Sequence, residues 1–164
     1  MTMRIYVGTY AKYNDGNLSG KWLDLEDYND KEEFLEACTE LHSDEDDLEL
    51  MFQDWEGIPD DMVSECSVDP KCWELIEAYD EFGEDTVNAY IYCFGEWNRG
   101  DFQDRYRGEY DSWEDFSEQL VDELGYLDEI PEHLRYYFDY EKYARDLRLG
   151  GDVCEHDGYY FWNN

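Results

Sequence analysis

Basic residues are scarce in this chain of 164 residues. Twelve Lys and Arg stand against 45 Asp and Glu, which gives a formal net charge of −33 at pH 7. An anion of this size is repelled by naked DNA, by RNA and by acidic membrane surfaces, so these are excluded as partners. Basic protein surfaces, in contrast, attract it over a long range. The charge therefore constrains the class of partner.

Long hydrophobic runs are absent as well. The opening apolar stretch at residues 5–7 is too short for the core of a signal peptide, and no run approaches the length of a transmembrane helix. The five cysteines are odd in number and irregularly spaced, at Cys38, Cys66, Cys72, Cys93 and Cys154. We therefore expect a cytoplasmic protein with free thiols.

A phosphate-binding loop is missing, although the segment YNDGNLSGKW at residues 13–22 contains its ingredients. A Walker A loop needs four residues between its first glycine and its Gly-Lys pair, and a Ser or Thr directly after the lysine. Here Gly16 and Gly20 enclose three residues, and Lys21 is followed by Trp22. The segment is therefore interpreted as a glycine-bearing connection between two strands.

Motifs for metal binding and catalysis are also missing. In the acidic run that starts at Asp44, the sixth position, where an EF-hand loop needs glycine, is Glu49. The chain has no CxxC pair for zinc and no GxSxG sequence, and its three histidines are scattered at positions 42, 133 and 156. Paired carboxylates of the glycosidase type stay open in so acidic a chain. We expect no enzyme, no cofactor and no metal.

Aromatic and aliphatic residues are plentiful, and their spacing predicts an α+β fold. Hydrophobic residues make up 42% of the chain, which is enough for a folded core and too many for a disordered acidic tail. Strands are expected at 3–10, 21–25, 48–55 and 104–110, helices at 30–41, 69–83, 84–94, 112–125 and 131–147, a linker at 95–102, and a hairpin that turns at 157–158. Trp22 is expected to pack in the core of the N-terminal part.

Strands and helices are mixed without a regular alternation, which indicates two or three small units. We expect an N-terminal α+β domain at 1–61, a mainly helical middle domain at 62–102, and a C-terminal α+β domain at 103–164. Seven of the twelve basic residues lie between Arg99 and Arg148. This last part therefore contains internal partners for its acids, whereas two surfaces of unrelieved negative charge would not associate.

Carboxylates recur every three or four residues along the expected helices. Like charges at this spacing disfavour an isolated helix, and a plain solvated face is one interpretation of each run. Four helical residues advance about 6 Å, and the net charge equals that of about 55 Å of duplex DNA. On an elongated scaffold such stripes would imitate a row of phosphates. The expected DNA-mimicking acids are Asp24, Glu26, Asp27, Glu32, Glu36, Glu40, Asp44, Glu45, Asp46, Asp47, Glu74, Glu77, Asp80, Glu81, Glu84, Asp85, Asp111, Glu114, Asp115, Glu118 and Asp122.

Two motifs resemble the ArdA antirestriction family. The first is the Lys-Tyr-Asn-x-Gly-x-Leu-x-Gly-x-Trp loop, matched by Lys12, Tyr13, Asn14, Gly16, Leu18, Gly20 and Trp22. The second lies near the other end and is matched by Pro131, Leu134, Tyr140, Tyr143, Ala144, Arg145, Asp146 and Leu147. Between about residues 60 and 110 the likeness is one of charge and helical character.

This resemblance implies a specific function. ArdA proteins are DNA mimics of conjugative plasmids, transposons and phages that occupy the DNA-binding groove of type I restriction-modification enzymes. The family is elongated, with three domains in line, and it dimerises through its C-terminal region. The resemblance therefore implies a homodimer whose partner is the methyltransferase core of such an enzyme.

Two other functions fit the composition. An acidic chaperone or inhibitor of another DNA-binding protein shares the electrostatics and differs only in its partner. An acid-surfaced enzyme of the halophilic type would carry similar charge around an active site, and folding at low salt would count against it.

Overall fold

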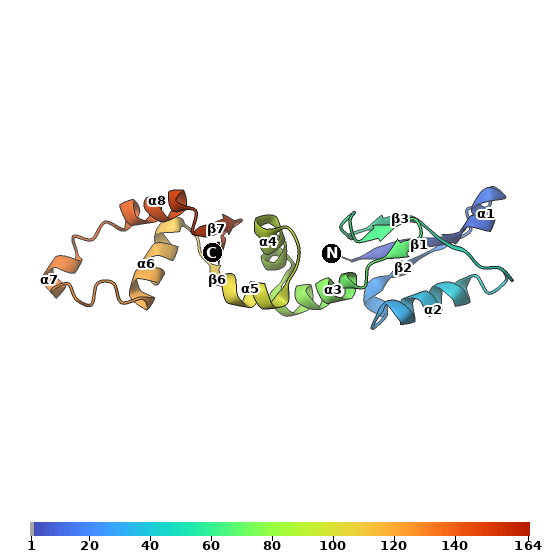
Figure 1. Cartoon of the computed structure of the whole chain (residues 1–164), viewed down its shortest axis with the longest axis horizontal. Helices are drawn as coiled ribbons and strands as arrows, with labels where there is room; N and C mark the ends of the chain where they lie inside the picture. Colours follow the sequence, from blue (N-terminus) through green and yellow to red (C-terminus); the bar gives the residue numbers. More distant parts are fainter. Residues whose placement is uncertain (1) are drawn as a thin grey trace. The chain divides into compact units, whose positions relative to one another are not determined.

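The computed structural model describes residues 2–164 and comprises two compact units, one ending at Glu84 and the other beginning at Asp85. Across the described residues there are eight α-helices and eight strands in small antiparallel sheets, which confirms the α+β class (Figure 1). The division into three domains stays a prediction. No helix in residues 2–164 is long and apolar enough to cross a membrane.

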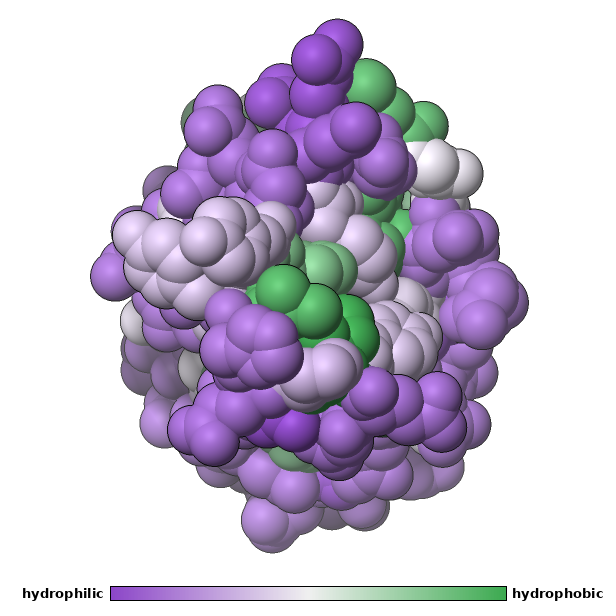
Figure 2. Space-filling view, turned by 90° about the vertical axis from the view of Figure 1, so that its left-hand side faces the viewer, coloured by the Kyte–Doolittle hydropathy of each residue, from purple (hydrophilic) through white to green (hydrophobic). Residues whose placement is uncertain are grey.

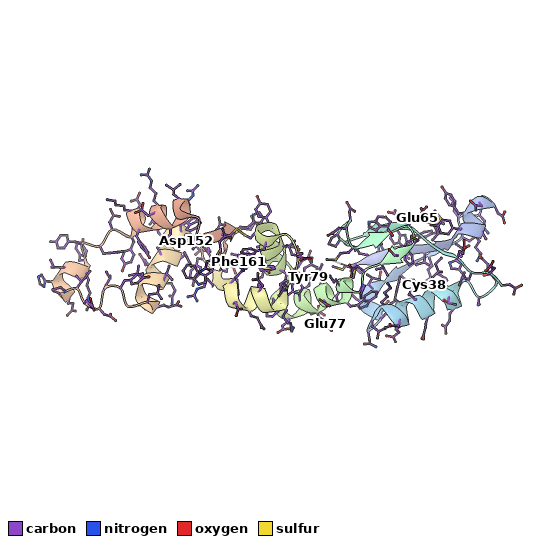
Figure 3. The ribbon with its side chains drawn as sticks, in the orientation of Figure 1. Cys38, Glu65, Glu77, Tyr79, Asp152 and Phe161 are labelled. Atoms are coloured by element: carbon purple, nitrogen blue, oxygen red, sulfur yellow. A yellow bond between two sulfur atoms is a disulfide. The ribbon has the colours of Figure 1, made fainter. Side chains whose placement is uncertain are left out.

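The first unit is built on a three-stranded antiparallel sheet in the order β2-β1-β3. The strands are β1 (Arg4–Thr9), β2 (Lys21–Asp24) and β3 (Leu50–Glu56). Helix α2 (Lys31–Leu41) covers one face of this sheet (Figure 1). Phe34 and Cys38 of α2 are completely buried, and the Phe34 ring lies 6.0 Å from that of Phe52 on β3 (Figure 3). The alternation of β1 and the helical period of α2 thus meet in one core.

The ends of β1 and β2 differ from the expected strand boundaries. The first strand ends at Thr9, whose side chain caps the short helix α1 (Tyr10–Asn14) by accepting a hydrogen bond from Lys12 N. A 3-10 turn, η1 (Leu25–Asp27), follows β2. The start of α2 is as expected, because the Asp30 carboxylate accepts a bond from Glu33 N at 2.9 Å.

Helix α3 (Lys71–Phe82) completes the first unit, after a small hairpin of β4 (Val63–Ser64) and β5 (Ser67–Val68). Trp73 of α3 lies 5.9 Å from the Phe34 ring and donates a hydrogen bond from Nε1 to Tyr28 O at 3.1 Å. The helix therefore shares the core of the N-terminal sheet.

The second unit is centred on a three-stranded sheet in the order β6-β8-β7. The strands are β6 (Tyr106–Glu109), β7 (Val153–His156) and β8 (Tyr159–Trp162). Phe161 of β8 is completely buried, and its ring contacts those of Tyr90, Phe94, Phe102 and Tyr106 at centroid distances of 5.5 to 6.2 Å (Figure 3). Tyr90 and Phe94 belong to α4 (Glu84–Phe94), so the helical assignment of this segment is confirmed.

The expected linker at 95–102 is wrong in its second half, which is helical from residue 99 onward. Helix α5 (Arg99–Arg105) begins there, and the Asn98 side chain caps it by accepting a bond from Asp101 N at 2.9 Å. Phe102 on this helix is 1% exposed, so burial of its ring outweighs the low helix propensity of Gly100.

The single helix expected at 131–147 is also wrong. Two helices, α7 (Glu132–Arg135) and α8 (Tyr140–Gly150), replace it, and α8 packs beside α6 (Trp113–Glu123). Asp139 accepts a bond from Lys142 N at 2.9 Å, and this N-cap competes with continuation of the preceding helix. Phe116 and Leu120 of α6 pack with Val153 and Tyr160 in a second cluster of buried residues.

The hairpin at the C-terminus is confirmed. Asp157 and Gly158 have φ angles of 50° and 86°, the positive values that a two-residue hairpin turn of type I′ requires. This turn joins β7 to β8 with His156 opposite Tyr159.

The expectation of free thiols fails for one pair. Cys93 on α4 and Cys154 on β7 form a disulfide across 61 residues of sequence, with their Cα atoms 6.2 Å apart. Tertiary packing brings these two elements together, which spacing along the chain does not reveal. Cys38, Cys66 and Cys72 are free, and burial raises the pKa of the Cys38 and Cys72 thiols to about 12.

Candidate acidic interface

The carboxylates of this chain lie at the surface. None of the 45, all of which fall within the described residues, is classed as buried. Most of the acids expected to mimic DNA are exposed, and Asp24, Glu45 and Glu84 are half-buried. The proposed surface is therefore available to solvent at most of its positions.

Helix α2 shows the arrangement most simply. Its inner side buries Phe34 and Cys38, while Glu32, Glu36 and Glu40 are exposed on the other side. These three glutamates, one helical turn apart, border a shallow hollow whose floor includes Leu35 and Thr39. The helical period alone places them in one row.

Helices α3 and α6 repeat this division. Cys72, Trp73, Leu75 and Ala78 of α3 are buried, as are Phe116, Ser117, Leu120 and Val121 of α6. The exposed acids are Glu74, Glu77, Asp80 and Glu81 on α3, and Glu114, Asp115, Glu118 and Asp122 on α6, with Asp111 just before it (Figure 3 labels Glu77). Each helix thus has an anionic outer face.

The remaining acids of the set lie at turns and helix ends. Asp24 ends β2, Glu26 and Asp27 lie in η1, and Glu84 and Asp85 begin α4. Glu26 accepts a bond from Met3 N at 3.4 Å. Asp46 and Asp47 are exposed in the turn after α2.

Asp44 and Glu45 share an internal counter-charge, the ammonium group of Lys12. Lys12 Nζ lies 2.9 Å from Asp44 Oδ1 and 3.6 Å from Glu45 Oε1, and Thr9 Oγ1 donates to Glu45 at 2.7 Å. The hydrogen bond from Lys12 lowers the pKa of the Asp44 carboxyl, and the same bond raises the pKa of Lys12. These two carboxylates therefore act first as internal counter-charges.

His42 completes this network at its buried end. The ring is 2% exposed, with Nε2 3.1 Å from Val7 O and Nδ1 3.0 Å from Lys12 Nζ. Because a carbonyl oxygen only accepts, Nε2 carries the proton and Nδ1 accepts from Lys12. The sequence showed no signal that these residues, about 30 positions apart, would meet.

The glycine-rich segment at 13–22 is held by one tyrosine. Tyr6 on β1 donates its hydroxyl to Leu18 O at 2.8 Å and accepts from Gly20 N at 3.1 Å. Its ring also packs edge-to-face on Trp22 at 5.5 Å, with the Arg4 guanidinium 4.7 Å from the Trp22 ring. The loop is thus pinned to the sheet and has a structural role.

The expectation that Trp22 packs in the core is therefore wrong. Leu23, the next residue on β2, is 9% exposed and faces the core, whereas Trp22 is half-buried on the opposite side of the sheet. Successive side chains of a strand point to opposite faces, so only one of these two large residues can enter the core.

Gly20→Ala should destabilise the first unit by about 1–3 kcal/mol, as overpacking generally does. A Cβ at this position would lie 2.6 Å from Val7 O and 2.7 Å from the Tyr6 ring. Urea denaturation measures the effect. Gly150→Ala is the control, because nothing lies within 4 Å of its Cβ position, and it should leave stability unchanged or raise it. Equal stability of both variants would contradict the close approach.

The second motif spans α7 and α8, with Pro131 and Leu134 at α7 and its remaining residues on α8. Ala144 is 3% exposed and Leu147 packs against the second buried cluster, whereas Arg145 and Asp146 are exposed. Tyr143 is half-buried, and burial raises its pKa. The motif therefore combines packing residues with charged residues that face solvent.

The second unit exposes several large hydrophobic residues. Figure 2, which views the side carrying α7, shows hydrophobic and intermediate residues near the centre of a hydrophilic surround. Exposed large hydrophobic residues of segment 124–137 are Leu124, Tyr126, Leu134, Tyr136 and Tyr137. We call this set the α7 patch.

Within residues 2–164, no three His, Cys, Asp or Glu side chains converge as a metal ion would require. His42 belongs to the network described above, and His156 stacks on Tyr92 with ring centroids 3.7 Å apart. Each of these two histidines thus has a structural partner within its own unit.

Comparison with known proteins agrees with this picture. The family model described as antirestriction protein (ArdA) matches residues 5–161. A search of curated proteins finds no match. Since the family model covers nearly the whole chain, including both end motifs and the acidic helices between them, the chain belongs to the ArdA family of antirestriction proteins.

Proposed function

We propose that this protein inhibits type I restriction-modification enzymes by imitating duplex DNA. The observation that carries the proposal is the set of outward carboxylates on α2, α3 and α6, each opposite a buried apolar face. Only twelve basic residues oppose 45 acids in the whole chain. Family membership supports an antirestriction role, and the DNA-like surface is our account of how that role is performed.

The mechanism is competitive occupancy. A groove that binds DNA is lined with Lys and Arg, and release of counterions contributes much of the binding free energy. A rigid array of carboxylates would gain the same contribution from counterion release, although it offers no bases for the enzyme to recognise. Inhibition should therefore be independent of the enzyme's recognition sequence, and no catalytic step or cofactor is involved.

The proposal also includes the assembly. We infer a cytoplasmic homodimer, joined through its C-terminal region and elongated, with three small domains in line so that the charges follow a duplex. Seven of the twelve basic residues lie between Arg99 and Arg148, which reduces repulsion there. The partner is the methyltransferase core of the enzyme.

The test is a competition between the purified protein and duplex DNA for a type I methyltransferase core, across a salt series. We expect displacement of DNA, with a logarithm of affinity that falls linearly with the logarithm of salt concentration and a slope of several units. Duplexes with and without the recognition sequence should be displaced alike once their own affinities are taken into account.

Affinity that is unaffected by salt would contradict the proposal. Failure to displace DNA, combined with tight binding to an unrelated basic protein, would favour an acidic chaperone instead. Loss of structure at low salt would favour the halophilic alternative.

A further inference from the structure

The connection between α2 and β3 is acidic and has no apolar anchor in its first part. Residues 43–47 read Ser-Asp-Glu-Asp-Asp, so four carboxylates follow one another without a hydrophobic side chain between them. Its backbone is tied to the end of α2 by a hydrogen bond from Glu45 N to His42 O at 3.1 Å. We call residues 44–47 the acidic turn. Because like charges this close repel one another, a fixed conformation of the acidic turn needs support from another element.

Lys12 on α1 provides this support. Its ammonium group has three protons to donate. Three acceptors lie around it, namely Asp44 Oδ1 at 2.9 Å, His42 Nδ1 at 3.0 Å and Glu45 Oε1 at 3.6 Å. The Lys12 side chain is 18% exposed, so most of it is packed against the protein. Helix α1 and the connection after α2 lie at the same end of the first unit (Figure 1).

Two buried residues orient the partners of Lys12. His42 donates from Nε2 to Val7 O at 3.1 Å, which leaves its Nδ1 as the acceptor that faces Lys12. Thr9 is completely buried, accepts from Lys12 N at 3.2 Å and donates from Oγ1 to Glu45 at 2.7 Å. Val7 and Thr9 belong to β1, the central strand of the sheet. The acidic turn is therefore attached to this strand through the network around Lys12.

Glu45 depends strongly on this lysine. Its second oxygen, Oε2, is shielded from solvent and has no hydrogen-bond partner in residues 2–164. A carboxylate in such surroundings is costly unless an opposite charge lies close to it, and Lys12 supplies that charge. Without Lys12, the Glu45 carboxylate would gain by moving into solvent, and Asp44 would lose its partner at the same time.

We propose that Lys12 is a positioning residue for the DNA-mimicking surface, because it holds the acidic turn in one conformation. The inference rests on the function proposed above. A mobile turn would have to be ordered when the protein binds its target, and each side chain that is immobilised on binding costs free energy. Asp46 and Asp47 are exposed on the same turn and are positioned by the same anchor.

Two accounts of Lys12 predict changes of opposite sign. If the surface acts through net charge alone, removal of a cation makes the protein more anionic and should tighten its binding to a basic groove. If Lys12 positions the acidic turn, the same removal weakens binding although the net charge has become more favourable. The sign of the change therefore distinguishes positioning from a simple effect of charge.

The test compares Lys12→Met with Lys21→Met, since each variant loses one positive charge and keeps an unbranched side chain of similar length. Lys21 is exposed on β2 and has no ion pair in the part of the chain that the structure describes, so it is the matched control. Both compete with duplex DNA for a type I methyltransferase core. K12M should lose about tenfold in affinity, whereas K21M should bind as the parent does or up to about twofold more tightly.

A double-mutant cycle with D44N/E45Q separates positioning from a general loss of structure. In this background the carboxylates that Lys12 holds are already neutral, so adding K12M should change affinity by less than about threefold. A general structural defect would instead reduce affinity by the same factor in both backgrounds. Amide hydrogen exchange of residues 43–48 should be faster in K12M than in K21M, while circular dichroism shows both variants folded.

Affinity of K12M equal to or above that of K21M would overturn the inference, as would an additive cycle. Unchanged exchange of the acidic turn in K12M would overturn it whatever the competition shows. Failure of the parent protein to displace DNA would contradict the proposed function itself. The exchange measurement on K12M needs no target enzyme, so it distinguishes loss of the anchor from failure of that function.

Discussion

Replacing six glutamates on α2 and α3 by glutamine is expected to weaken inhibition of a type I enzyme by about a hundredfold. The variant is E32Q/E36Q/E40Q/E74Q/E77Q/E81Q. Six ion pairs of about 0.5 kcal/mol each sum to about 3 kcal/mol, which is about two powers of ten in affinity. DNA displacement from the methyltransferase core, measured at one fixed salt concentration, gives the change.

The same variant should also flatten the dependence of affinity on salt, since fewer counterions are exchanged on binding. Its thermal stability should equal or exceed that of the parent, because like charges recur along both helices. Reduced inhibition could then not be attributed to unfolding.

Glu36→Gln alone is the control and should change affinity only a few-fold, as one surface pair does. If a single neutralisation abolished inhibition while the fold stayed intact, the distributed surface would be wrong. A carboxylate with a specific chemical role would then be the better explanation.

Phe161→Ala should destabilise the second unit by about 3–5 kcal/mol, the usual cost of removing a buried phenylalanine ring. Phe161 is completely buried, and four aromatic rings of α4, α5 and β6 surround it. The substitution leaves a cavity that these rings cannot fill without moving. Urea denaturation followed by near-ultraviolet circular dichroism measures the loss.

Tyr136→Ala removes an aromatic ring that is 90% exposed, and it should change stability by less than about 0.5 kcal/mol. Comparison of Phe161→Ala with Tyr136→Ala separates the effect of lost packing from the effect of losing any aromatic residue. A cost below about 1 kcal/mol for Phe161→Ala would mean that the arrangement of rings around β8 is wrong.

Elements with strong local signals were predictable. The capped start of α2 at Asp30, the helical spacing of Val87, Tyr90 and Phe94 in α4, and the turn at Asp157-Gly158 each follow from interactions within a few residues. Such interactions join residues that are close in sequence, so these elements can be predicted from the sequence alone.

Elements decided by distant contacts were not predictable. Helix α5 forms in a glycine-containing stretch because the helix buries the Phe102 ring against Phe161. The break before α8 depends on Asp139, which could equally have stayed on the face of a continuous helix. The disulfide of Cys93 and Cys154 required α4 and β7 to meet first.

The acidic surface was likewise predictable in part. Helical periodicity placed Glu32, Glu36 and Glu40 in one row opposite a buried side, and the structure has them there. Periodicity could not distinguish Asp44 and Glu45 from their neighbours, because Lys12 reaches them only after β1 and the turn following α2 are brought together.

By itself, the sequence determined the sign and density of the charge, the class of fold and the family, since composition, periodicity and motif all lie along the chain. Only the tertiary structure decided which acids have an internal counter-charge and which side of β2 enters the core. Those outcomes depend on side chains that are far apart in sequence, and packing of the two cores is what brings them within reach of one another.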